Sequence, residues 1–244
     1  MSVEVDGIWP GAVTLRQGWS VAESRPWNDT ISWAHLRIVR GGSTFLDGCV
    51  AALADLGAQG VLSPPLPPGA RRVWEEADFI PHASLRVLRR DLGRVPAPDH
   101  LVVPGSFADV REALRIDALA FAEFWRFDGA SMAEALRATP RSVIHVIRGH
   151  DRSMVGYAIT GVGVAVAFLQ RIAVEPDHRG MGFGRSLLRA SARWAQQAGA
   201  GSLLLNTQAD NDAAIGLYVS EGFDVLGTGL DVLRRWPCSA THRS

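Results

Sequence analysis

Three glycines at alternate positions, Gly180, Gly182 and Gly184, stand where an apolar run ends and a helical pattern begins. The apolar run covers residues 168–174, and Pro176 closes it because proline has no N–H to give to a sheet. Glycine leaves backbone N–H groups open to an anion, and the first four N–H groups of a helix lack partners within it. The helix dipole also favours negative charge at this end. The sequence therefore predicts a phosphate-binding turn between a strand and a helix.

A glycine-rich turn of this kind is also found in dinucleotide-binding proteins and in turns that bind no ligand. The G-x-G-x-x-G spacing of dinucleotide-binding proteins is absent, and the turn lies far from the first strand and helix of the chain, so that class is excluded. A glycine-rich turn that binds no ligand stays open, because short motifs also occur by chance.

A second pattern follows the helix that is expected at residues 183–198. A buried strand is expected at 202–207 and a further helix at 210–221, with Tyr218 inside that helix and Gly222-Phe223 after its end. The glycine turn and this strand–turn–helix stretch are the two parts of the chain with the residue types for chemistry.

The remaining elements follow from hydrophobic periodicity and from glycine and proline positions. Expected helices lie at 44–56, 70–77 and 107–124, and a short one opens at the capping-box spacing of Ser131 and Glu134. Expected strands lie at 60–62, 85–90, 142–147, 154–160, 164–174 and in two segments of 224–236, after a hairpin within 12–40 that turns at residues 26–29.

Two stretches, Arg179 to Gly184 and Leu205 to Phe223, together resemble the motifs of the GNAT superfamily of N-acetyltransferases. The resemblance covers residues 100–236 and is greatest to the bacterial ribosomal-protein N-terminal acetyltransferases. It implies the GNAT fold, an α/β (α+β) arrangement in which a mixed central sheet is flanked by helices. It also implies acetyl-CoA as the cosubstrate.

The resemblance assigns roles to matching positions. The backbone of Ile172, Ala173 and Val174 would pair with the pantetheine arm, and Asn211 would make a further cosubstrate contact. Tyr218 matches the phenol that hydrogen-bonds the departing sulfur, since a phenol of ordinary pKa ~10 is protonated at neutral pH. A helix N-cap explains Asn211 equally well, and a core position is the alternative for Tyr218. The pyrophosphate would lie on Arg179, Gly180, Met181, Gly182, Phe183 and Gly184.

Asn206 departs from the family pattern. The ribosomal-protein enzymes carry there a glutamate proposed as general base, and an amide cannot accept a proton from an ammonium group. The base is therefore expected elsewhere in the chain, or it is water. Glu123, Asp128, His145 and His150 are candidates, each with a surface or strand-end position as the alternative. These histidines lack metal-ligand spacing, so no metal is expected.

The first ninety residues echo the second part of the chain. Gly41 to Thr44 replaces the whole phosphate turn in this echo, and a tryptophan replaces the tyrosine. The chain therefore resembles a tandem GNAT whose first copy is truncated, does not bind coenzyme A, and supports the fold or the acceptor site; chance similarity is the alternative. The matching stretches are Arg37 to Val39 with Arg171 to Ala173, Trp74 and Phe79 with Tyr218 and Phe223, and residues 85–90 with 230–235.

A domain boundary is expected at residues 93–100, which contain two prolines and show no periodicity. The expected parts are a degenerate GNAT-like domain at 1–92, this linker, a catalytic GNAT domain at 101–236 and a tail at 237–244.

Composition limits the partners. The 244 residues carry a formal net charge of +0, and their 25 basic residues are all arginine and form no dense run, so nucleic acid and anionic membranes are not expected partners. Neither a leader pattern nor a membrane-spanning stretch is evident, which predicts a cytoplasmic monomer or homodimer. Cys49 and Cys238 lack the spacing of a zinc site or a disulfide framework.

The expected function is acetyl-CoA-dependent N-acetylation of a primary amine by direct attack in a ternary complex. The amine is a small molecule or a protein N-terminus. A non-catalytic acyl-CoA-binding or regulatory module is the alternative, which Asn206 favours and Tyr218 opposes. Transfer of a longer acyl group, or transfer from an acyl carrier, is a third hypothesis.

Overall fold

A computed structural model describes residues 2–237, which form two compact units. One unit runs to Leu85 and resumes at Thr228, and the other is Arg86–Gly227. The expected division differs in two ways: residues 93–100 belong to the second unit instead of linking two domains, and residues 228–236 complete the first unit. Beyond residue 237, the expected tail lies outside the described residues.

The first unit is a mixed sheet. Parallel strands β4 and β5 lie at its centre, and their neighbours pair antiparallel. Strand β13 completes the sheet because it pairs with β5 on one side and with β6 on the other, which explains why residues 228–236 leave the second unit. The strand order is β1 (Glu4–Gly7), β2 (Val13–Gln17), β3 (Ser20–Pro26), β4 (Trp33–Arg40), β5 (Gly60–Leu62), β13 (Leu230–Arg235) and the first part of β6 (Ile80–Asp91).

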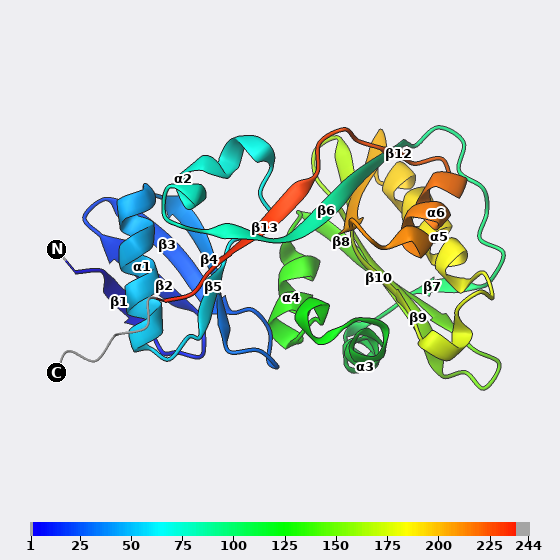
Figure 1. Ribbon diagram of the computed structural model, residues 1–244. Helices are drawn as coiled ribbons and strands as arrows, with labels where there is room; N and C mark the ends of the chain where they lie inside the picture. Colours follow the sequence, from blue (N-terminus) through cyan, green and yellow to red (C-terminus); the bar gives the residue numbers. More distant parts are fainter. Residues whose placement is uncertain (1, 238–244) are drawn as a thin grey trace. The chain divides into compact units, whose positions relative to one another are not determined.

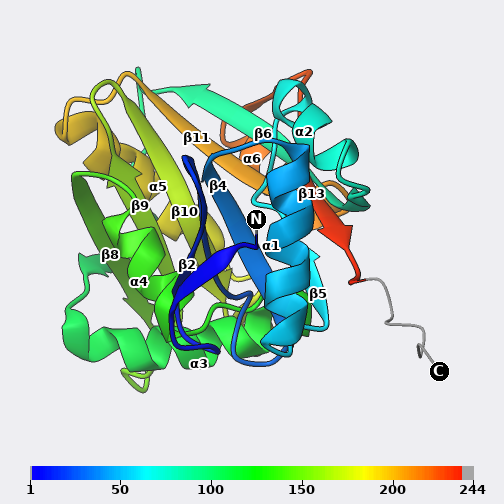
Figure 2. The ribbon, with the colours of Figure 1, turned by 90° about the vertical axis from the view of Figure 1, so that its left-hand side faces the viewer.

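Helix α1 (Ser43–Asp55) lies against this sheet (Figure 2), and five of its side chains are buried in the core between them. The helix expected at 70–77 is divided into the 3-10 turn η1 (Pro68–Ala70) and the short helix α2 (Arg72–Glu75). The hairpin expected within 12–40 is instead three strands, because a two-residue turn at Gly18-Trp19 separates β2 from β3. The φ angle of +57° at Gly18 suits such a turn.

The second unit is a mixed sheet with helices on both faces (Figure 1). Strand β12 (Asp224–Val225) pairs with β6 outside the main order. That order is the second part of β6, β11 (Ser202–Gln208), β10 (Val166–Val174), β9 (Met154–Val162), β8 (Arg141–Arg148) and β7 (Val102–Pro104). Helices α5 (Phe183–Gln197) and α6 (Asp212–Ser220) share one hydrophobic core with the sheet, and α3 (Val110–Ala120) and α4 (Gly129–Arg137) share another on the opposite face.

Two helix boundaries on the α3 face differ from expectation. The helix expected at 107–124 opens with the 3-10 turn η2 (Phe107–Asp109) and ends at Ala120, because Phe121 is extended with φ −119° and ψ 147°. Another 3-10 turn, η3 (Glu123–Trp125), follows. Asp128, rather than Ser131, caps α4, since its side chain accepts the Ser131 N–H.

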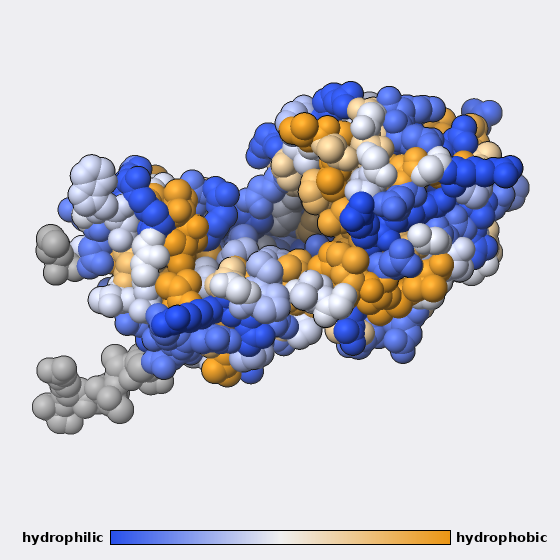
Figure 3. Space-filling view, turned by 90° about the horizontal axis from the view of Figure 1, so that it is seen from above, coloured by the Kyte–Doolittle hydropathy of each residue, from blue (hydrophilic) through white to orange (hydrophobic). Residues whose placement is uncertain are grey.

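The surface is mixed in character. Hydrophilic side chains cover much of the second unit in Figure 3, with small hydrophobic patches among them. Single exposed residues such as Phe107 and Val164 contribute to the apolar surface. Within residues 2–237, every helix is too short or too polar to cross a membrane.

Candidate active site

Strands β10 and β11 begin side by side and then separate. Parallel pairing joins Val166–Phe168 to Ser202–Leu204, whereas β10 continues to Val174 and β11 to Gln208. On its other side β10 remains paired with β9 up to Val174. The edge of β10 that faces β11 beyond Phe168 therefore has no strand partner among the described residues. Such an edge can bind an extended ligand that carries amide groups.

A β-bulge lies at Gln170, just beyond the last of these pairs. Leu169 and Arg171 pair with adjacent residues of β9, so Gln170 is an extra residue on β10. Leu169 packs in the core under α5 before the bulge, and Ile172 packs against that core after it. Ala173 belongs to the core under α3. The bulge therefore reverses the alternation of the strand and turns Arg171 towards α3.

The turn between β10 and α5 has a backbone that suits glycine. Gly180 and Gly182 have φ angles of +78° and +83°, in the left-handed region. Gly182 is the N-cap of α5, and no side chain caps the helix there. A Cβ on Gly180 would meet no atom within 4 Å, and one on Gly184 would lie 3.5 Å from Leu217. The first two glycines are thus required by conformation, while Gly184 makes an ordinary contact.

The other residues of the turn have distinct positions. Arg179 is exposed, and its guanidinium donates a hydrogen bond of 2.9 Å to the carbonyl of Ala120 at the end of α3. Met181 is exposed. The ring of Phe183 lies 4.6 Å from the His100 ring and 6.2 Å from the His178 ring, measured between centroids.

Tyr218 lies in α6 with its side chain in the core under α5. Burial raises the pKa of Tyr218 to about 12, and the positive charge of Arg171 acts in the opposite direction. The phenol is therefore protonated at neutral pH and can donate a proton. Asn211 is the N-cap of α6, where its Oδ1 accepts the N–H of Ala214 at 3.2 Å.

A buried ion pair, which no sequence motif indicates, lies beside the split. Arg171 makes two hydrogen bonds to the Asp117 carboxylate, at 2.7 and 2.8 Å, and donates to the carbonyl of Trp125 at 2.6 Å. Its guanidinium carbon lies 3.4 and 4.0 Å from the ring centroids of Phe121 and Phe127. The pair joins β10 to the segment that connects α3 to α4.

Tyr157 and the backbone of the connecting segment complete this cluster. The Tyr157 hydroxyl donates to Asp117 at 2.6 Å, and the N–H of Phe127 donates to the same carboxylate at 2.6 Å. Burial, followed by the charge of Asp117, raises the pKa of Tyr157 well above its ordinary value. Asp117 has a side-chain exposure of 0%, so its charge depends on these partners.

A family model for the acetyltransferase (GNAT) family matches residues 110–223. That stretch is a GNAT acetyltransferase domain. It contains the split strands, the glycine turn and Tyr218.

Individual relatives match in different parts. The mycothiol acetyltransferase of Rhodococcus jostii (strain RHA1) is 28% identical over 190 residues, which cover 68% of this chain and 61% of that protein. The ribosomal-protein bS18 alanine N-acetyltransferase of Escherichia coli (strain K12) is 42% identical over 71 residues, which cover 29% of this chain and 48% of that protein. The chain thus spans less than two thirds of the length of these relatives.

A solved structure resembles the chain over both units. The tandem GNAT protein from the clavulanic acid biosynthesis pathway has a TM-score of 0.66 at 15% identity, and the match covers 96% of this chain and 83% of that one. At this identity the likeness shows the fold. The tandem GNAT fold expected from the sequence is therefore confirmed.

The four candidates for a general base in the GNAT site are spread over the second unit. Asp128 accepts a backbone N–H at 2.7 Å as the N-cap of α4, and His145 packs beside α5, where burial lowers its pKa to about 4. Glu123 and His150 are exposed, as is Asn206 on β11 beyond its paired part. Asp128 thus has a structural role as a helix cap, and His145 lies buried against Trp194. Within residues 2–237 no group of three or more His, Cys, Asp or Glu side chains could hold a metal ion.

Proposed function

We propose that the second unit is an acetyl-CoA-dependent N-acetyltransferase that acts on a primary amine. The observation that carries the proposal is the split between β10 and β11 next to a left-handed glycine turn at the start of α5. The free strand edge suits the amide groups of a pantetheine arm. The uncapped N–H groups of the helix suit a diphosphate.

In the proposed complex, the backbone of Ile172, Ala173 and Val174 pairs with the pantetheine arm, and the diphosphate lies on residues 179–184. The open space in front of Gly180 supports this placement. Asn211 remains a proposed cosubstrate contact. Its Oδ1 serves as the helix cap and its amide nitrogen donates to Gln208 at 3.4 Å, so one amide hydrogen is left for the ligand.

The proposed reaction moves the acetyl group from sulfur to nitrogen. A neutral amine attacks the thioester carbonyl, the C–N bond forms and the C–S bond breaks, and the ammonium proton passes to water or to a base. Backbone N–H near Val174 polarises the carbonyl. Tyr218 gives its proton to the departing thiolate and the phenolate then regains a proton from water, since its pKa of about 12 keeps the phenol protonated at neutral pH.

The acceptor is proposed to be a small-molecule amine or a protein N-terminus. The relatives include a mycothiol acetyltransferase and a ribosomal-protein alanine N-acetyltransferase, which supports keeping both classes. The first unit is proposed to bind no coenzyme A, since α1 follows β4 after only Gly41 and Gly42.

Asn206 supports a second candidate function, a module that binds acyl-CoA without catalysis. The residue is exposed on β11, at the position where the related enzymes carry their base. An amide there cannot accept the proton of the amine. Tyr218 and its available proton oppose this candidate.

Calorimetric titration with coenzyme A and a free-thiol assay test the proposal together. The assay contains acetyl-CoA and a library of primary amines, including sugars, polyamines and peptides with free N-termini. The proposal expects one coenzyme A site per chain and thiol release with at least one amine. A protein that binds no coenzyme A would contradict it, and binding without turnover of any amine would favour the non-catalytic module.

A further inference from the structure

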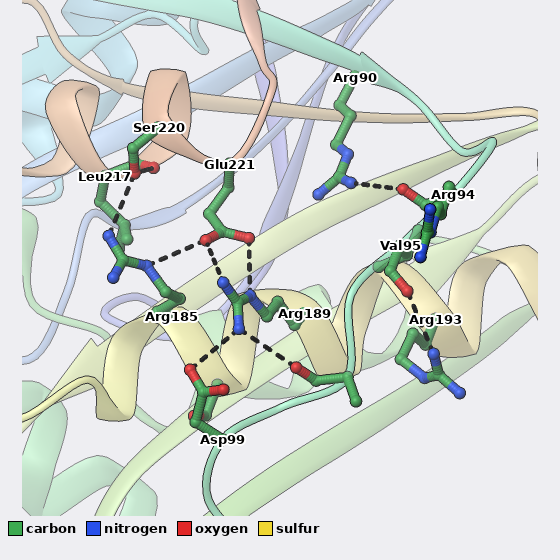
Figure 4. Close-up of polar contacts among 12 residues, drawn as sticks. Arg90, Arg94, Val95, Asp99, Arg185, Arg189, Arg193, Leu217, Ser220 and Glu221 are labelled. Atoms are coloured by element: carbon green, nitrogen blue, oxygen red, sulfur yellow. Dashed lines mark hydrogen bonds and ion pairs between the residues drawn. The ribbon is translucent and has the colours of Figure 1, made fainter.

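Residues 92–100, here called the strap, run along α5 and are held by its side chains (Figure 4). Gln196, Arg193 and Arg189 donate to three strap carbonyls at 2.8, 3.1 and 3.2 Å. Arg189 also binds Asp99 at 2.9 Å. These contacts explain why the expected linker is part of the second unit. They also fix the place where the strap ends.

Glu221, at the end of α6, binds Arg189, which in turn binds the strap. Its carboxylate receives two hydrogen bonds of 2.9 Å from Arg189 and an ion-pair contact of 3.0 Å from Arg185 (Figure 4). The side-chain exposure of Glu221 is 5%, so its charge depends on these arginines. The strap, α5 and α6 are thus joined by one network of charges.

The strap ends with His100 against the glycine turn. The backbone N–H of His100 donates to the Ser186 hydroxyl at 3.2 Å, and His100 Nδ1 lies 3.0 Å from the same oxygen. The His100 ring lies 4.6 Å from the Phe183 ring. A Cβ built on Gly182 would come to 3.2 Å from His100 Cε1. The imidazole is therefore a neighbour of the N-cap of α5.

The contact with Ser186 engages Nδ1 of His100 and leaves Nε2 as the ring nitrogen with no partner among the described residues. The Ser186 oxygen already accepts the His100 N–H, and its own hydrogen can be given to Nδ1. A neutral ring that accepts at Nδ1 carries its hydrogen on Nε2. That nitrogen is bonded to Cε1, which would lie 3.2 Å from a Cβ on Gly182, whereas Nδ1 would lie at 3.8 Å and Nε2 beyond 4 Å. In this tautomer Nε2 is a donor one bond from the ring atom nearest the glycine turn, on the side of the ring away from Ser186.

We propose that His100 is a cosubstrate-binding residue whose Nε2–H donates to a diphosphate oxygen of coenzyme A. The inference rests on the proposed function, since it deepens the same site. The ring is fixed by Ser186 and Phe183 before the ligand arrives, so little side-chain freedom is lost on binding. The strap carries this donor to the turn.

Two substitutions separate the proposed donor from a packing role. His100→Phe keeps a ring against Phe183 and removes the donor, while His100→Gln removes the ring and keeps an amide donor at a similar reach. Each folded variant is titrated with coenzyme A and with dephospho-coenzyme A. We expect His100→Phe to bind both ligands about 10- to 100-fold more weakly, as for a lost hydrogen bond to a charged group, and His100→Gln to recover most of the affinity.

Three results would overturn the inference. Wild-type affinity in His100→Phe would show that only the ring matters, and a loss confined to coenzyme A would place the contact at the 3′-phosphate. If His100→Phe does not fold, Ser186→Ala decides, because it frees the ring and should weaken both ligands several-fold; unchanged binding would overturn the inference. Failure of the wild type to bind coenzyme A would instead contradict the proposed function.

Discussion

Both units contain a parallel strand pair that opens after three residue pairs, β4 with β5 in the first and β10 with β11 in the second. In the first unit a cavity of about 660 Å³ lies at the opening, lined by residues such as Ile38, Leu66 and Trp74. Trp74 is the residue that the sequence pairs with Tyr218. An open strand pair is therefore common to both units and does not by itself identify a coenzyme A site.

The connection that follows the open strand distinguishes the two units. Residues 41–42 join β4 to α1, whereas residues 175–182 join β10 to α5. A Cβ on Gly41 would lie 2.5 Å from the Phe45 ring, so a side chain of the helix occupies the space behind this short connection. The long connection instead exposes two left-handed glycines at a helix start. The long connection with two left-handed glycines is thus the feature that the second unit has and the first lacks.

Substitution of Tyr218 and of Trp74, its counterpart in the first unit, should give the largest difference in kcat between the two units. Tyr218→Phe removes the proposed proton donor and should lower kcat by about 10²- to 10⁴-fold with little change in the KM for acetyl-CoA. Trp74→Phe should leave kcat at the wild-type value, although it removes buried volume from the first unit. Steady-state kinetics with an amine from the library measures both. A Tyr218→Phe enzyme with nearly normal kcat would show that water, and not Tyr218, protonates the departing thiolate.

The sequence aligns Arg171 with Arg37, and each forms an ion pair. The pair of Arg171 with Asp117 is buried, whereas the pair of Arg37 with Glu23 is exposed. Asp117→Asn should destabilise the second unit by about 3–5 kcal/mol, because it leaves the buried Arg171 charge unpaired. Glu23→Gln should cost about 0–1 kcal/mol, since the side chains of Arg37 and Glu23 are 62% and 51% exposed. Urea unfolding of both variants makes the comparison. Equal losses would mean that the buried pair is weakly coupled to folding.

The N-cap glycines Gly182 and Gly42 provide a matched pair for the phosphate turn. Gly182→Asp should weaken coenzyme A binding by about 100-fold or more, because it places a carboxylate at the proposed diphosphate site. Gly42→Asp should leave binding unchanged, since Gly42 has an extended backbone with no atom within 4 Å of its Cβ position. Calorimetry measures both affinities, and circular dichroism confirms folding. If Gly182→Asp binds coenzyme A as the wild type does, the diphosphate does not bind at this turn.

A smaller effect of pH on stability is expected from His145. Its folded pKa of about 4 lies below the ordinary value of 6.5 because the ring is buried, so the unfolded chain binds more protons between these values. The free energy of unfolding should therefore fall by on the order of 2–3 kcal/mol as pH drops from about 6.5 to 4. His145→Phe should flatten this dependence in unfolding experiments at several pH values. An unchanged slope would assign the pH dependence to other groups. His82 in the first unit is one such group, because burial and the charge of Arg234 lower its pKa as well.

The sequence predicted those elements whose signals are local. The strand that became β10, the glycine turn and α5 follow from a run of apolar residues, three glycines and a helical period, and the structure has all three. The break of the expected helix at Phe121 was missed, because the interaction that favours it comes from Arg171, 54 residues after its partner Asp117. Such pairings leave no periodic trace in a sequence.

The strap is a case in which local sequence signals predict a linker and distant contacts order the segment instead. Two prolines and the absence of a period are typical of a linker, and this segment has no secondary structure. Its order comes from arginine and glutamine side chains on a helix that lies 92 to 104 residues later in the chain. The general base was not located by sequence for a related reason, since the family position is occupied by Asn206 and the alternatives lie on separate elements.

The extra residue at Gln170 also fixes how this strand can change in evolution. If Gln170 were itself paired with β9, every later residue would change face, which would turn Arg171 towards the aliphatic side chains under α5 and place Ile172 against Asp117. A guanidinium without a partner and a carboxylate without a counter-charge would then both be buried, at a cost comparable to the whole stability of a small domain. Deletion of Gln170 alone would instead leave Leu169 and Arg171 opposite their present partners, so position 170 is where this strand should accept a change of one residue in length. A one-residue change elsewhere between Gln170 and Val174 would mark a protein that has also rebuilt the contacts of α3.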